Sequence, residues 1–222
     1  MEHPNKPLNK SNERLCLIMG NRAIVKPEGK DIGVYLHWNG GIDSVTGFLK
    51  YCELRGFRSF SDDSYGIARF CQVVGNFFGG DLSIGIETDV RESEVEDYWL
   101  DNGIYVVRNW GIVRHVGGSE GREGYDLNDM LHAIDVKQPL TERLGDFLDG
   151  VETDISDIEI GDIVFVQSVL GNYEKHEVVG IGEDRIVNGR NVKGIPYVDK
   201  WGSGPNNPNN YLRGKVRVWK KE

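Results

Sequence analysis

The sequence predicts an α+β protein: an N-terminal mixed α/β domain with two helices, followed by a small C-terminal β-barrel or β-sandwich. Three observations predict this class. Strand-like and helix-like patterns alternate between residues 15 and 116, short β-branched runs dominate after residue 158, and glycine is abundant. The 29 glycines among 222 residues exceed the usual share of about 7%, which indicates many turns and short elements.

The same shifts in pattern divide the chain into four segments. A polar, flexible N-terminus comes first, then the α+β domain, then an acidic linker with short helices, and finally the small β domain. Their expected bounds are 1–14, 15–116, 117–157 and 158–222.

The first strand and helix are expected around a pair of glycines. Residues 32–38 form an apolar, β-branched and aromatic run, which predicts a strand that ends in a tight turn. The helix that follows is expected to be capped by Asp43 or Ser44 and to stop near Gly56.

The remaining elements of the N-terminal unit are predicted from helix-capping residues and from the alternation of apolar and polar residues. A second helix is expected from the acidic cap at 61–63 to the glycines that begin at Gly79. A strand at 82–86 and a hairpin over 103–113 complete the unit.

Two further regions hold expected elements. Within the linker, short helices are expected at 127–134 and 141–148. The β domain is expected to contain a hairpin turn at 188–189 and an exposed loop at 201–210.

Charge is distributed unevenly along the chain. The net charge is −9, and residues 119–162 alone carry 13 acidic and 3 basic side chains. A duplex-DNA binder would present a broad basic face, so this distribution argues against that class and favours a protein partner. Mimicry of nucleic acid by the acidic segment is a second interpretation, and a solvated linker surface is the simpler one.

Cysteine usage and hydropathy point to the cytosol. Three cysteines, at Cys16, Cys52 and Cys71, are too few for a disulfide framework, and the last two fall on apolar helix faces, where burial is expected. No histidine pair has metal-ligand spacing, so no metal is expected. No apolar run is long enough to span a bilayer, which predicts a protein without a membrane partner.

One stretch has the composition of a ligand site. Glycines between a strand and a helix start let backbone amides approach an anion, so the stretch could cradle phosphate. The pattern Gly-Gly-x-Asp-Ser at residues 40–44 resembles the phosphate-binding loop of ATP pyrophosphatases that adenylate their substrates, although Asn39 stands where that family has serine. The simpler interpretation is a glycine turn before an ordinary helix cap. The candidate ligand-binding residues, which include two on the second helix, are Trp38, Asn39, Gly40, Gly41, Asp43, Ser44, Tyr65 and Arg69.

A larger part of the chain has a second resemblance. The segments 33–41, 65–69, 76–80 and 101–105 resemble uncharacterised accessory proteins carried by phages, prophages and mobile elements of Gram-positive bacteria. The resemblance covers about residues 18–115. It implies a small protein that binds and blocks a host component, especially a defence nuclease or a signalling nucleotide.

The C-terminal part has a weaker resemblance. Residues 161–164 and 178–186 resemble the β-rich core of bacterial signal peptidases, which use a serine activated by a lysine. The serine motif is missing, and Lys175 lies one residue away from the position expected for the activating lysine. The resemblance therefore implies a barrel without protease activity. Basic side chains suggest a candidate nucleic-acid-binding face, with solvated strand edges as the simpler interpretation. These residues are Lys193, Lys200, Arg213, Lys215 and Arg217.

Together these features favour a non-enzymatic phage or mobile-element protein that binds and inhibits or sequesters a host factor in the host cytoplasm. No complete set of nucleophile, base and orienting group can be assembled, and no cofactor is expected. Two alternatives stay open: a nucleotide-binding adenylating enzyme that uses the loop from Asn39 to Ser44, and a nucleic-acid adaptor that uses the C-terminal barrel. A homo-oligomer is also left open.

Overall fold

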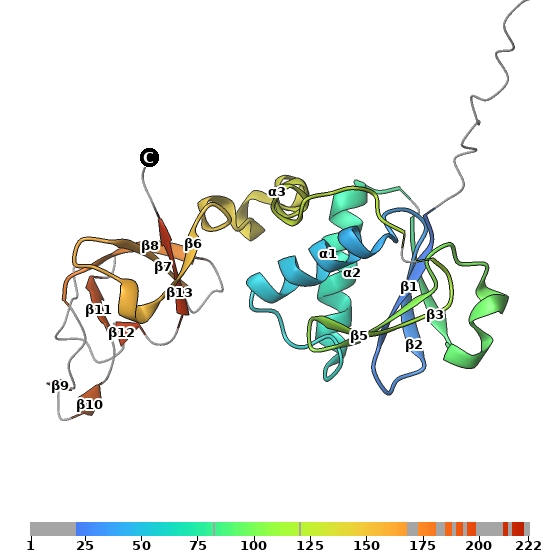
Figure 1. Ribbon diagram of the computed structural model, residues 1–222, viewed down its shortest axis with the longest axis horizontal. Coiled ribbons are helices and arrows are strands. Elements are labelled where there is room, and N and C mark those ends of the chain that lie inside the picture. Colours follow the sequence, from blue (N-terminus) through green and yellow to red (C-terminus); the bar gives the residue numbers. More distant parts are fainter. Residues whose placement is uncertain are drawn as a thin grey trace, which may run out of the picture.

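The computed structural model describes residues 21–81, 83–119, 121–167 and 173–180, and short strands between 185 and 219. It confirms the α+β class, because helices and β-sheets are both present (Figure 1). No helix within these described ranges is long and apolar enough to cross a membrane.

A five-stranded sheet organises the first part of the chain. Its strand order is β3-β2-β1-β4-β5. Strands β1 and β4 run parallel at the centre, and the remaining pairs are antiparallel. The two central strands are almost continuously buried because apolar groups cover both of their faces. The bounds are β1 Ala23–Pro27, β2 Ile32–Leu36, β3 Ile84–Thr88, β4 Ile104–Arg108 and β5 Gly111–Val116.

Most of these strands match the predictions. The hairpin of β4 and β5 is confirmed. Strand β3 begins at Ile84 rather than at 82. Leu82, the first residue of the expected strand, lies outside the described residues, and the Ser83 N–H donates to the carbonyl of Asp81 at 2.7 Å.

Two α-helices, α1 and α2, pack on one face of this sheet, and a third, α3, packs on these two helices (Figure 1). Their apolar side chains join those of the strands in one core, which includes the fully buried ring of Phe48. That ring meets Phe70 and Phe77 edge to face, at centroid distances of 6.4 and 5.1 Å. The bounds are α1 Ile42–Leu54, α2 Ser64–Phe78 and α3 Leu127–Lys137.

The caps of α2 are as predicted, but that of α1 is not. The Asp63 carboxylate accepts from the Tyr65 N–H, and Gly79 ends α2 in the left-handed conformation. The prediction that Asp43 or Ser44 caps α1 is wrong, since the N-cap is Gly41, which makes no side-chain cap bond.

The opposite face of the sheet has a smaller cover. The 3₁₀ segment η1 Glu92–Tyr98 lies over it, and Val95 and Tyr98 pack against Ile24 and Ile104. This segment makes the fold three-layered at its central strands.

The acidic segment contains one helix of the two expected. Helix α3 packs on α1, and Met130 and Ile134 are fully buried in the main core. The second expected helix, at 141–148, is replaced by two 3₁₀ turns, η2 Leu140–Glu142 and η3 Gly145–Phe147. Gly145, the first residue of η3, has a φ of +54°, which an α-helix does not tolerate.

A six-stranded sheet follows, with the order β12-β11-β8-β7-β13-β6. Its outer strands, β12 and β6, are not paired with each other among the described strands, so closure into a barrel stays a prediction. Strands β9 and β10 pair antiparallel. The turn expected at 188–189 and the loop expected at 201–210 lie outside the described residues. The bounds are β6 Val151–Asp154, β7 Ile163–Gln167, β8 Tyr173–Val178, β9 Arg185–Val187, β10 Arg190–Val192, β11 Ile195–Val198, β12 Tyr211–Leu212 and β13 Lys215–Trp219, with the 3₁₀ turn η4 Ile155–Asp157 between the first two.

Candidate functional site

The glycine loop at residues 39–44 joins β2 to α1 and lies tightly against the start of β1. Asn39 has a φ of +53°, which asparagine tolerates. The Gly40 N–H donates to the carbonyl of Asn21 at 2.8 Å. A Cβ atom on Gly40 would lie 2.3 Å from that carbonyl oxygen and 2.8 Å from the Ala23 nitrogen. Glycine is therefore required here by the close approach of two backbone segments.

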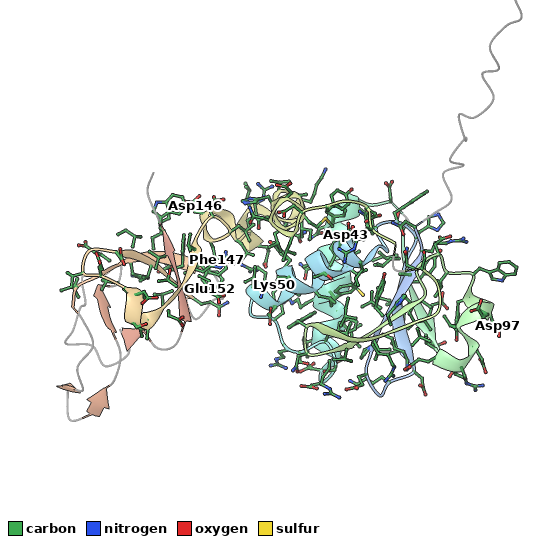
Figure 2. The ribbon with its side chains drawn as sticks, viewed as in Figure 1. Asp43, Lys50, Asp97, Asp146, Phe147 and Glu152 are labelled. Carbon is green, nitrogen blue, oxygen red and sulfur yellow. The ribbon has the colours of Figure 1, made fainter. Side chains whose placement is uncertain are left out.

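Residues 121–125, here called the strap, lie across the start of α1. The Ile42 N–H donates to the carbonyl of Gly121 at 2.9 Å. The carboxylate of Asp43 accepts from the backbone N–H groups of Glu123, Gly124 and Tyr125 at 2.9, 2.8 and 3.1 Å. Figure 2 shows Asp43 at the start of α1, beside the chain that leads into α3. Asp43 thus holds the strap instead of capping its own helix.

The carboxylate of Glu123 points from the strap into the loop. It accepts from Asn21 Nδ2 at 2.6 Å, from Asn39 Nδ2 at 3.4 Å, and from the hydroxyl of Ser44. Burial raises the pKa of Glu123, although these hydrogen bonds oppose the shift. The polar groups expected to hold a phosphate are therefore bound to a carboxylate of the protein itself.

A cavity of about 350 Å³ is formed by strap residues together with residues at the start of α1 and of α3. Within the described residues, the guanidinium of Arg122 has no hydrogen-bond or ion-pair partner, and Tyr125 is 46% exposed. A cation and an aromatic ring at one cavity can bind a planar, anionic molecule. The lining residues are Ile42, Asp43, Thr46, Arg122, Tyr125, Asp126 and Leu127.

The structure separates the predicted ligand-binding residues into two groups. Trp38 is half-buried beside the loop and meets His37 edge to face at 4.7 Å. Tyr65 and Arg69 are exposed near the start of α2. The other end of α2 leads into β3, whose first residue pairs with Leu36, shortly before the loop. A helical rise of 1.5 Å per residue puts Tyr65 roughly 20 Å from the loop.

The candidate nucleic-acid-binding residues are described only in part. Arg217 is half-buried and donates to the carbonyls of Phe147, Leu148 and Gly150 at 3.0 to 3.2 Å. Its guanidinium therefore ties β13 to the chain before β6. Lys215 lies in β13, but its side chain is outside the described residues, as are Lys193, Lys200 and Arg213.

Burial was expected for Cys52 and Cys71, and the structure buries the first fully and the second in part, while Cys16 lies outside the described residues. Cys52 is fully buried, and burial raises the pKa of its thiol well above the ordinary value. Cys71 is partly buried, with a pKa raised by the same cause. Such thiols are poor nucleophiles at neutral pH. Across the described part of the chain, no group of His, Cys, Asp and Glu side chains is arranged to hold a metal ion.

Sequence reasoning missed Arg122, Glu123 and Tyr125. They are about 80 positions from the loop, and the surrounding glycines indicated only flexibility. The one available signal was the mixture of charged and aromatic residues inside a glycine-rich stretch, which is unusual for a plain linker.

Replacing Asp43 by asparagine is expected to lower the free energy of unfolding by about 2 kcal/mol at pH 7, because an amide NH₂ would face the strap N–H groups. Burial alone would raise the pKa of Asp43, but four backbone N–H groups together lower it. The stabilisation is therefore present above the ordinary aspartate pKa and is lost as the pH falls through the lower folded value. Urea unfolding at pH 7 and pH 3 checks this. A loss of equal size at both pH values would contradict it.

Comparison with known proteins finds no family model that matches the chain, and no curated protein or solved structure with significant similarity to it.

Proposed function

We propose that this chain is a non-enzymatic binding protein of a phage or mobile element, which sequesters a signalling nucleotide in the host cytoplasm. The observation that carries the proposal is the cavity beside the strap, where Arg122 and Tyr125 lie at one opening. The resemblance of residues 18–115 to phage accessory proteins supports the biological setting.

The residues that line the cavity suit the parts of a nucleotide. The Arg122 guanidinium can donate paired hydrogen bonds to a phosphate, and the Tyr125 ring can stack on a base. Thr46 and the carboxylate of Asp126 line the same cavity and can accept from ribose hydroxyl groups. Phosphate, base and ribose would therefore each meet one side chain of matching chemistry, while the Asp43 carboxylate in the same lining already accepts from the strap N–H groups.

The closed glycine loop favours sequestration over adenylation. An adenylating enzyme needs the loop to hold the phosphates of ATP, but Asn39 and Ser44 donate to Glu123. Asn39, Ser44 and Glu123 are not among the residues that line the cavity, so a ligand there would bind without disturbing those bonds. We therefore expect the bound nucleotide to be released unchanged.

The proposal retains the predicted division of the chain. The ligand would bind to the α+β domain, predicted at 15–116, and to the strap that follows it. The proposal assigns no part in ligand binding to the barrel or sandwich predicted at 158–222, in which Gln167 and Tyr173 donate to carbonyls at the end of α1.

Replacing Arg122 or Tyr125 by alanine is expected to weaken nucleotide binding about tenfold or more, since each contact contributes roughly 1 to 3 kcal/mol. Isothermal titration with nucleoside phosphates and cyclic dinucleotides measures the effect. Arg69→Ala and Tyr65→Ala are matched controls, because they remove the same side-chain types at the far end of α2. Full binding by the Arg122 and Tyr125 variants, with loss in the controls, would move the site to α2 and refute the proposal.

A further inference from the structure

Trp99 has an unusual backbone conformation for its type. Four non-glycine residues of the described chain have positive φ, and three of them are asparagine or aspartate, which tolerate the left-handed region. The fourth is Trp99, with φ +53° and ψ +44°. A bulky side chain there is strained, so folding alone would favour glycine at this position.

The side chain of Trp99 does not compensate for this strain by packing, because it is 80% exposed. Its two neighbours, Tyr98 and Leu100, pack against the cluster on the outer face of the sheet. The Tyr98 hydroxyl also accepts from the Arg91 N–H at 3.1 Å. A firmly held turn therefore presents the indole to the solvent, as at the aromatic anchor of a protein interface.

A cavity of about 320 Å³ adjoins the indole. The side chains of Val95 and Leu100 give it an apolar part, and Glu96 gives it a carboxylate. Arg22, which also lines it, is neutralised by Asp101 through bonds of 2.9 and 3.2 Å. The cavity can thus accommodate an aliphatic chain with a charged end.

The free charge around Trp99 is negative. Glu92 pairs with Arg114, and Glu94 pairs with Arg91. Glu96 and Asp97 are exposed, and neither has an ion-pair partner among the described residues. Figure 2 shows Asp97 on the side of the sheet away from α1 and α2, so this surface is separate from the helical layer.

We propose that Trp99, with Glu96 and Asp97, forms a docking surface for a basic segment of a protein partner, which inserts an arginine side chain into the adjoining cavity. The guanidinium would stack on the indole and pair with the carboxylates, while its stem contacts Val95 and Leu100. This inference goes beyond nucleotide sequestration and does not depend on the cavity beside the strap. The carboxylates of Glu96 and Asp97 disfavour nucleic acid, because they would repel its phosphates.

The test is titration with a seven-residue peptide that carries two arginines among glycines and serines, followed by the indole ¹H–¹⁵N signals of the full chain. We expect the Trp99 signal to shift, with an affinity that falls as salt rises. The same peptide with citrulline in place of arginine keeps the shape but loses the charge, and it should not shift the signal. Equal binding of both peptides would overturn the proposal.

A substitution separates recognition from folding. Trp99→Gly should reduce binding of the arginine peptide about tenfold, while the melting temperature stays equal or rises because glycine relieves the left-handed strain. Because this variant lacks the Trp99 signal, its binding is measured by isothermal titration. Leu140→Ala is the matched control, since it removes another apolar side chain that is 81% exposed. Unchanged binding by Trp99→Gly would overturn the proposal. Self-association through Trp99, or a shift caused by single-stranded DNA, would do so as well.

Discussion

Replacing Asp135 by alanine is expected to lower the free energy of unfolding by about 3 to 5 kcal/mol, because it removes the carboxylate that accepts from two buried donors and from one exposed N–H group. The Asp135 carboxylate is 5% exposed. It accepts from the Tyr51 hydroxyl at 2.6 Å, and from the N–H groups of Leu144 and Gly145 at 2.6 and 3.1 Å. Urea unfolding followed by circular dichroism measures the loss.

A nearby aspartate is the control for this prediction. Asp146 is 62% exposed and pairs with Lys175 at the surface. Asp146→Ala should therefore lower the free energy of unfolding by less than about 1 kcal/mol. Equal losses for the two variants would show that Asp135 does not hold α3 to α1. Since α3 follows directly after the strap, the loss should also weaken ligand binding at the strap cavity.

Gly40→Ala is the second substitution with a large expected effect. The added Cβ would lie 2.3 and 2.8 Å from backbone atoms of Asn21 and Ala23, which cannot move without displacing β1. We expect Gly40→Ala to lower the free energy of unfolding by about 3 kcal/mol. Because the same contact shapes the loop that holds Glu123, the strap should loosen, and amide exchange of residues 121–125 should accelerate.

Gly75→Ala gives the matched comparison. A Cβ at Gly75 would meet only Ile84 Cδ1, at 3.7 Å, within helix α2. Alanine favours the helix by up to about 1 kcal/mol over glycine, so this variant should be as stable as the parent or more so. If Gly40→Ala were equally harmless, the close approach of the loop to β1 would not be required.

Elements with strong local signals were predictable from sequence. Helix α2 begins at the Asp63 cap and ends at Gly79, and both signals are contained in the segment itself. The β4–β5 hairpin is likewise local. The start of α1 was misread because the carboxylate of Asp43 accepts from N–H groups about 80 residues away, and no local pattern reports such a contact.

The same limit applies to the candidate site. The residues of the glycine loop were found from their spacing, but their internal partner, Glu123, was not. The prediction of a second helix in the acidic segment was wrong for a related reason. Asp135 draws the N–H groups of Leu144 and Gly145 to its own carboxylate and so interrupts the helical pattern.

Native mass spectrometry tests the central claim most directly. The purified full-length chain is incubated with a bacterial extract that has been heated to remove proteins, and its mass is compared with that of Arg122→Ala treated in the same way. The account predicts that the parent retains an adduct of nucleotide mass, that the adduct is released unchanged, and that the variant retains much less. A parent that stays at its apo mass would contradict nucleotide sequestration, and so would a retained nucleotide that is converted to product.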